Sequence, residues 1–214
     1  MITSGYSPGP ADQARNGSAR ASTGASLGSG SMKRIAVIGC GGSGKTYLSN
    51  RVGEALALPV THLDAEYYDQ TWTPLPPEDF AARQRELVQQ RQWLIEGNYA
   101  STLPIRLQAA DTLVSLDLPA WACLAGIAQR RFKYRGGQYH QDGVFDRITV
   151  GFVRYIFGYR RTMRPRVRQL ISEHGTHLYV VTLTSRRQAA RWLNTLTTPD
   201  HDPEAGTGTD YSSI

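Results

Sequence analysis

The sequence has only two cysteines and no long apolar run, and each shortage argues against a class of protein. No segment approaches the roughly 18 to 20 consecutive apolar residues of a membrane-spanning helix, and no charged stretch leads into an apolar core at the amino terminus. Cys40 and Cys123 lie far apart in the sequence, so we expect two free thiols and no disulfide scaffold. These absences predict a cytoplasmic protein.

The length and composition predict one folded domain with polar extensions. A chain of 214 residues with 40% hydrophobic content is long enough for one α/β domain and short for two. Residues 1–31 and 197–214 have almost no bulky apolar side chains, so we expect a disordered leader and a disordered tail. The folded domain is expected to span residues 32–196, and Met32 is a candidate start of translation.

Within residues 32–196, short β-branched segments alternate with longer segments of helical periodicity. This alternation is typical of a parallel sheet with helices on both faces, so we predict an α/β three-layer sandwich around a five-stranded parallel sheet. The predicted strands are residues 33–39, 59–64, 93–97, 111–119 and 176–183. The predicted helices are residues 44–57, 77–91, 120–134, 146–173 with a break at Pro165, and 186–196.

Residues 39–46 read GCGGSGKT and satisfy the pattern G-x-x-x-x-G-K-[ST] of a phosphate-binding loop. A predicted strand precedes this segment and a predicted helix follows it, as the pattern requires. The glycines permit a backbone whose N–H groups cradle a phosphate, and the helix amino terminus adds partial positive charge. We therefore predict that a Mg-nucleoside triphosphate, ATP in particular, binds here. The predicted nucleotide-binding residues are Gly39, Cys40, Gly41, Gly42, Ser43, Gly44, Lys45 and Thr46.

Polar residues with predicted chemical roles lie in this loop and at three strand ends. Lys45 is expected to reach the β and γ phosphates, and the Thr46 hydroxyl is expected to bind Mg²⁺. Ligands of parallel sheets bind beyond the carboxyl ends of strands, where this sequence carries Asp64, Glu96 and Asp117. We assign Glu96 to the metal and Asp64 to catalysis at an acceptor hydroxyl. Capping of the following turn is the alternative role for each carboxylate.

Basic residues are concentrated between residues 129 and 168. This segment holds eleven Arg or Lys against two acidic residues, a net charge of +9 in a chain of +6. Such an excess predicts a polyanionic partner, either nucleotide phosphates or a nucleic acid. The glycine-rich stretch inside it predicts a lid at about residues 130–147, and we assign Arg130, Arg161 and Arg164 to catalysis. A solvated basic helix face is the alternative.

The ordered motifs IGCGGSGKTYLS, THLD, WLIEGNY, DTLVSLDLP, RRFKYRG and YRRTMRPR resemble those of adenylate-kinase-like P-loop kinases. They are most similar to the bacterial proteins known as DNA topology modulation proteins. The resemblance covers about residues 32–196 and implies a nucleoside-monophosphate-kinase-like fold, ATP with Mg²⁺, and Arg130 as a lid arginine. The chain departs from adenylate kinases at residues 96–100, EGNYA, which lack their acceptor-binding arginine; AMP is therefore not the expected acceptor.

Two functions follow from these patterns. One is a phosphotransferase that moves the γ-phosphate of Mg-ATP to a small-molecule or nucleotide acceptor. The other is an ATP-dependent, nucleic-acid-associated regulator that uses the basic segment. We favour the first because the sequence has no helix-turn-helix, zinc or OB-fold signature. The sequence does not identify the acceptor, and His62 is assigned no role because no metal-ligand pattern includes it.

Overall fold

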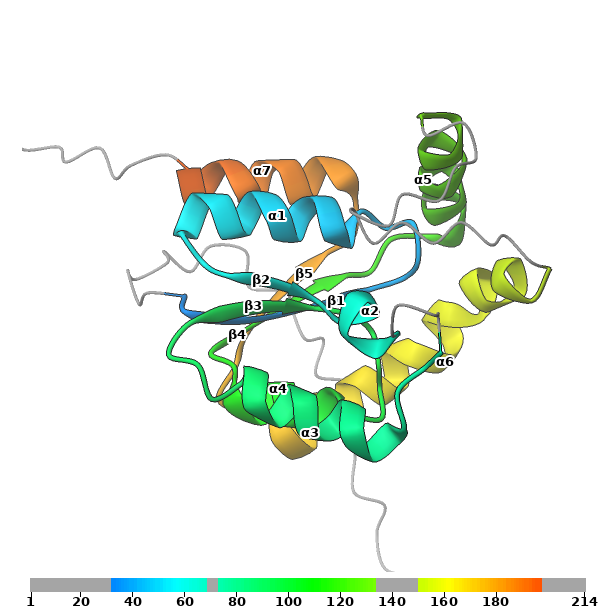
Figure 1. The fold of residues 1–214 in the computed structure, drawn as a ribbon. Helices are drawn as coiled ribbons and strands as arrows, with labels where there is room; N and C mark the ends of the chain where they lie inside the picture. Colours follow the sequence, from blue (N-terminus) through cyan, green and yellow to red (C-terminus); the bar gives the residue numbers. More distant parts are fainter. Residues whose placement is uncertain (1–31, 69–72, 134–149, 198–214) are drawn as a thin grey trace, which may run out of the picture. The chain divides into compact units, whose positions relative to one another are not determined.

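A five-stranded parallel sheet forms the centre of the domain (Figure 1), as predicted. The computed structural model describes residues 32–68, 73–133 and 150–197; the predicted leader, most of the predicted lid and the tail after residue 197 lie outside them. The spatial order of the strands is β2-β3-β1-β4-β5, and every neighbouring pair is parallel. The strands are β1 (Arg34–Gly39), β2 (Val60–His62), β3 (Trp93–Glu96), β4 (Thr112–Leu116) and β5 (Tyr179–Leu183).

Helices cover both faces of the sheet (Figure 1). α1 (Lys45–Leu56) and α7 (Arg186–Thr197) pack together on one face, and α3 (Pro77–Leu87), α4 (Leu103–Ala109) and α6 (Val150–His174) cover the other. The short α2 (Leu63–Tyr67) and α5 (Ala120–Lys133) lie near the carboxyl ends of the strands. None of the described helices combines the length and apolar character that crossing a membrane requires.

Alternating side chains of β1 divide the core into two clusters. Ile35 and Val37 pack toward α1 and α7, whereas Ala36 and Ile38 pack toward α3 and α4. All four are almost fully buried because successive side chains of a central strand point to opposite, helix-covered faces. β1 is the central strand, between β3 and β4. The segment that follows it therefore leaves the sheet at the middle of the end formed by the carboxyl ends of the strands. Residues 39–46 therefore lie at the carboxyl end of the sheet, where parallel sheets bind ligands.

The structure differs from the predicted elements in three respects. The second strand ends at His62, and Asp64 lies in α2 instead of ending that strand. α2 and α4 were not predicted because helices of five and seven residues are too short to show a clear period. The predicted break at Pro165 is wrong, since α6 continues through it. Proline has no N–H group, so the carbonyl of Arg161 lacks its usual hydrogen bond within the helix. Both residues are exposed, and water can bind that carbonyl instead.

Candidate active site

The glycine loop, residues 39–46, joins β1 to α1 through a tight turn. The Ser43 amide donates to the Cys40 carbonyl at 3.1 Å, and Ser43 itself is buried in the turn. Gly42 and Gly44 adopt φ angles of 76° and 91°, in the left-handed region that side chains disfavour. Gly44 is also the N-cap residue of α1, directly before Lys45. The predicted sequence of strand, loop and helix is therefore present, with the positive φ angles that the glycines permit.

The glycine loop packs tightly against α5. A Cβ atom added at Gly42 would lie 2.3 Å from the carbonyl oxygen of Cys123 and 2.6 Å from Cγ1 of Ile127. A Cβ atom at Gly44 would meet no atom within 4 Å. Both glycines thus have positive φ angles that disfavour a side chain. Only at Gly42 would a side chain also collide with a neighbouring helix, α5.

We expect Gly42→Ala to destabilise the protein more than Gly44→Ala does. Gly44→Ala adds only left-handed backbone strain and should lower the free energy of unfolding by about 1–2 kcal/mol. Gly42→Ala adds the same strain and a clash with α5, so its cost should reach about 3 kcal/mol or more. Urea denaturation of both variants measures the difference. Equal losses of stability would contradict this account of the loop.

A buried carboxylate lies beside the two polar residues that end the glycine loop. Lys45 Nζ is 3.6 Å from Glu96 Oε1, and the Thr46 hydroxyl donates to Glu96 Oε2 at 3.5 Å. The Lys45 ammonium also donates to the Cys40 carbonyl at 3.3 Å. Glu96 ends β3, next to β1, and its side chain is only 6% exposed. The structure therefore brings together the residues predicted to bind phosphate and metal.

Glu96 is held in its ionised form by its neighbours. Burial raises the pKa of Glu96, but the positive charge of Lys45 and the hydrogen bond from His62 lower it by more, so the net pKa is below the ordinary glutamate value. A carboxylate that remains charged in a buried position can offer oxygen atoms to a cation. The Thr46 hydroxyl and the Glu96 carboxylate supply the hard oxygen donors that Mg²⁺ prefers, and the set therefore fits that ion.

His62 belongs to this group, although no metal-ligand pattern of the sequence includes it. Its Nδ1 lies 2.9 Å from Glu96 Oε2, and its Nε2 lies 3.0 Å from the side-chain oxygen of Asn50 on α1. His62 and Glu96 are register partners in the β2–β3 pair, so they end adjacent strands at the same level. Pairing of these two strands was the signal that could have identified His62 as a neighbour of Glu96.

The residues after β3 connect the glycine loop to α6. The Gly39 amide donates to Asn98 Oδ1 at 2.8 Å, and the Tyr159 hydroxyl donates to the same oxygen at 3.3 Å. The Asn98 amide in turn donates to the Tyr155 hydroxyl at 3.4 Å. Asn98 therefore ties the start of the glycine loop to two tyrosines of α6.

Asp64 lies at the border of an aromatic cluster. It is exposed on α2 and accepts a hydrogen bond from the Tyr99 hydroxyl at 2.7 Å. Burial and the charge of Asp64 raise the pKa of Tyr99, so this phenol remains protonated and donates. The Tyr99 ring packs against Tyr67 and Phe80, with centroids 5.0 and 4.7 Å away. Tyr67, Phe80 and Tyr99 therefore form an aromatic cluster beside Asp64.

Arg106 is a second residue that the sequence did not single out. It is fully buried on α4 and donates to the carbonyls of Gly97 and Tyr99, at 2.7 and 3.3 Å. Burial lowers its pKa to about 10, against the opposing influence of Glu96. Arg106 therefore holds the turn that carries Asn98 and Tyr99. Its position on an unpredicted short helix left no pattern that could have revealed it.

Arginines of α6 meet the carboxylate that follows β4. Arg160 Nε donates to Asp117 Oδ1 at 3.1 Å, and Arg164 pairs with the other oxygen of the same carboxylate. Arg160 and Arg164 lie one helical turn apart and share this face. Arg161, which was predicted, is exposed beside them, and Arg130 is half-buried on α5. Asp117 therefore pairs with Arg160 and Arg164, and not with Arg161.

Comparisons with known proteins give only distant likenesses. No family model and no curated protein sequence matches the chain. A shikimate kinase from Acinetobacter baumannii is 17% identical, with a TM-score of 0.49 over 77% of this chain and 90% of that one. A sugar kinase from Janibacter is 14% identical, with a TM-score of 0.46 over 78% and 99% of the two chains. A gluconokinase from Sinorhizobium meliloti is 16% identical, with a TM-score of 0.38 over 78% and 94%. At these identities and TM-scores, none of these likenesses indicates a function for this chain.

Proposed function

We propose that this protein is a phosphotransferase that moves the γ-phosphate of Mg-ATP to a small-molecule or nucleotide acceptor. The observation that carries the proposal is the convergence of Lys45, Thr46 and Glu96 at the end of β1 and β3, directly after a loop with positive-φ glycines. Phosphoryl transfer depends mainly on positioning and on neutralising charge, and these groups supply both.

Each residue of the glycine loop has a role in this reaction. The backbone N–H groups of residues 39–46 and the amino terminus of α1 bind the phosphates, and Lys45 stabilises the charge that develops on the transferring group. Thr46 and Glu96 would hold Mg²⁺, which supplies neutralisation of phosphate charge when bound. His62 acts as a positioning residue, because its contacts to Glu96 and Asn50 restrain the Glu96 carboxylate.

The acceptor is proposed to bind between α2 and the turn after β3. Asp64 is exposed there, accepts from the Tyr99 hydroxyl, and can position an acceptor hydroxyl or take its proton. The adjacent aromatic rings of Tyr67 and Tyr99 favour an acceptor with a planar or apolar part. Assays of ATP-dependent phosphorylation across nucleosides, nucleotides and hydroxylated metabolites would identify it.

Asp117 is proposed to hold arginines at the border of the site until phosphates arrive. Its carboxylate pairs with Arg160 and Arg164, which are about 40% exposed and so remain accessible. Guanidinium groups bind phosphate oxygens in a bidentate manner, and a nucleotide would compete with Asp117 for them. We keep Arg130 and Arg161 in the proposed phosphate-binding set. They lie on α5 and α6, and their positive charges would approach the phosphates from these helices.

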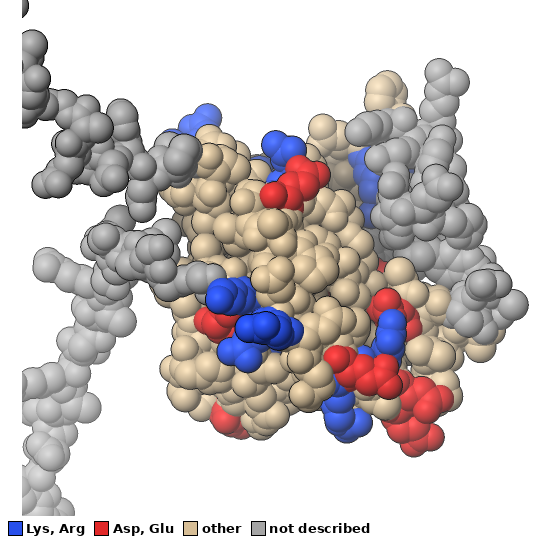
Figure 2. Space-filling model, turned by 60° about the vertical axis from the view of Figure 1, so that its left-hand side comes forward, with Lys and Arg blue, Asp and Glu red and all other residues tan. Residues whose placement is uncertain are grey.

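The second candidate function, a nucleic-acid-associated regulator, has support only from the concentration of arginines in residues 129–168. On the face in Figure 2, the described basic side chains form small separate groups with acidic ones among them. A surface that binds a nucleic-acid backbone needs a continuous basic stripe. The described residues form no such stripe on the face in Figure 2.

Substitutions on α6 distinguish the two functions. We expect Arg160→Ala and Arg164→Ala to lower kcat about tenfold or more while changing ATP affinity little, because these charges matter most in the transition state. Arg166→Ala, on the same helix and exposed, is the matched control and should retain the parent's turnover. ATP turnover and binding to duplex DNA are measured in all three variants. Unchanged turnover with lost DNA binding would favour the regulator instead.

A further inference from the structure

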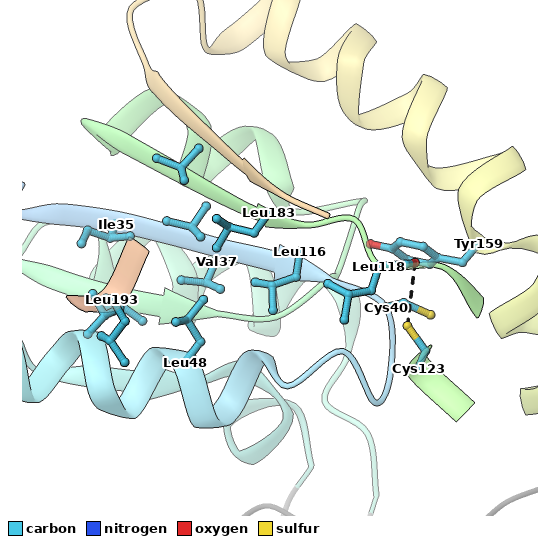
Figure 3. Close-up of a cluster of buried hydrophobic side chains, with 14 of the residues drawn as sticks. Ile35, Val37, Cys40, Leu48, Leu116, Leu118, Cys123, Tyr159, Leu183 and Leu193 are labelled. Atoms are coloured by element: carbon cyan, nitrogen blue, oxygen red, sulfur yellow. Dashed lines mark hydrogen bonds between the residues drawn. The ribbon is translucent and has the colours of Figure 1, made fainter. Parts of the chain in front are cut away.

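Two thiols meet between the glycine loop and α5. Cys40 belongs to the loop and Cys123 to the first turn of α5, and both are free and almost fully buried. Figure 3 shows the two sulfur atoms close together, and both residues belong to the same buried cluster. Cys123 Sγ also lies 3.9 Å from the Leu118 carbonyl. The only two cysteines of the chain are therefore neighbours, although the sequence separates them widely.

We propose that Cys40 and Cys123 form a redox site, in which a reversible intrachain disulfide distorts the glycine loop and stops ATP turnover. The existence of the disulfide does not depend on the proposed function; only its effect on turnover rests on that function. No role in phosphoryl transfer accounts for a thiol on α5 facing a thiol of the loop.

The surroundings favour Cys123 as the attacking thiolate. The neighbouring Cys40 thiol lowers the pKa of Cys123, burial raises it, and the positive charges of Lys45 and Arg186 lower it again. The net pKa of Cys123 is below the ordinary cysteine value, whereas the neighbouring Cys123 thiol and burial raise the pKa of Cys40. The thiolate is the reactive form of cysteine, and the protonated partner is placed to resolve the first product.

A hydroperoxide is the proposed oxidant, with hydrogen peroxide as its simplest example. The Cys123 thiolate attacks one peroxide oxygen and the O–O bond breaks, which leaves a sulfenic acid on Cys123 and a hydroxide that takes up a proton. The Cys40 sulfur then attacks the Cys123 sulfur, and the sulfenic oxygen leaves as water with the Cys40 proton. Two thiols and one peroxide thus give one disulfide and two water molecules.

The disulfide would disturb the groups that bind phosphate. A disulfide bond of about 2.05 Å is shorter than any contact between two separate thiols, so oxidation would draw the Cys40 and Cys123 sulfurs together. The Cys40 carbonyl accepts from Lys45 Nζ and from the Ser43 amide, and both contacts would move with it. The close approach of Gly42 to the Cys123 carbonyl leaves the loop little room to adjust.

The test uses the full chain, reduced and then treated with hydrogen peroxide. We expect a mass lower by two hydrogen atoms, a linked peptide containing Cys40 and Cys123, and a fall in ATP turnover of roughly tenfold or more, since small misplacements at reacting groups have large effects. Dithiothreitol should restore both mass and turnover. Cys123→Ala should have the parent's turnover before treatment and keep it afterwards; Cys123→Ser replaces it if the alanine variant does not fold.

Each part of the proposal has its own contrary result. Sulfinic acid or a dimer between chains, formed without the linked peptide, would overturn the redox site. A linked peptide with unchanged ATP turnover would overturn its effect on the glycine loop. Absence of ATP turnover in the reduced protein would instead contradict the proposed function, and the mass measurement would still decide whether the disulfide forms.

Discussion

Replacement of Lys45 by alanine is expected to lower kcat for ATP turnover by about a hundredfold or more, which corresponds to several kcal/mol of barrier. Lys45 is the cation of the glycine loop, and its ammonium lies next to Glu96 and the Cys40 carbonyl. In the proposed reaction it moves onto the β and γ phosphates, where negative charge concentrates in the transition state. Turnover is measured at saturating Mg-ATP so that weaker binding does not contribute.

Lys33→Ala provides the matched control for this substitution. Lys33 is an exposed lysine that directly precedes β1, at the opposite end of the strand from the glycine loop. Lys33→Ala removes one positive charge, as Lys45→Ala does, but far from the glycine loop. It should leave turnover unchanged. A Lys45→Ala variant that is folded and retains the parent's turnover would show that the loop does not catalyse phosphoryl transfer.

Glu96→Gln is expected to produce the second large loss, again about a hundredfold in turnover, together with a higher Mg²⁺ requirement. Glutamine keeps the size of the side chain but removes the charge that pairs with Lys45 and, as proposed, attracts the metal. The two effects are separated by measuring turnover at increasing Mg²⁺ concentrations. Partial recovery at high Mg²⁺ is the expected sign of a role in metal binding.

Glu54→Gln is the control for Glu96. Glu54 is an exposed glutamate on α1 that pairs with Arg51 at 2.8 Å. Because the pair is exposed to solvent, it contributes little to stability. The control should therefore show the parent's turnover and Mg²⁺ dependence. If Glu96→Gln is folded and also matches the parent in both, Glu96 is not a metal ligand and its burial beside Lys45 serves the fold alone.

Several features of the site could be predicted from the sequence because they depend on local patterns. The glycine loop was predicted from residue spacing and from its place between strand and helix, and both neighbours are present. Glu96 was placed at a strand end because a short apolar run, residues 93–95, precedes it, and it does end β3. Asp64 was misplaced at a strand end, because the turn into the short α2 changes the local structure without changing the apolar pattern.

The sequence by itself determined the sheet class, the loop and the residue types at the strand ends, since hydrophobic periodicity and glycine spacing act over a few neighbouring residues. The tertiary structure alone decided which side chains meet: His62 with Glu96, Arg160 with Asp117, and Cys40 with Cys123. These contacts arise from the order of strands in the sheet and from the packing of α5 and α6 against the core. Residues far apart in the chain become neighbours only when the whole core has formed, and no local pattern encodes that.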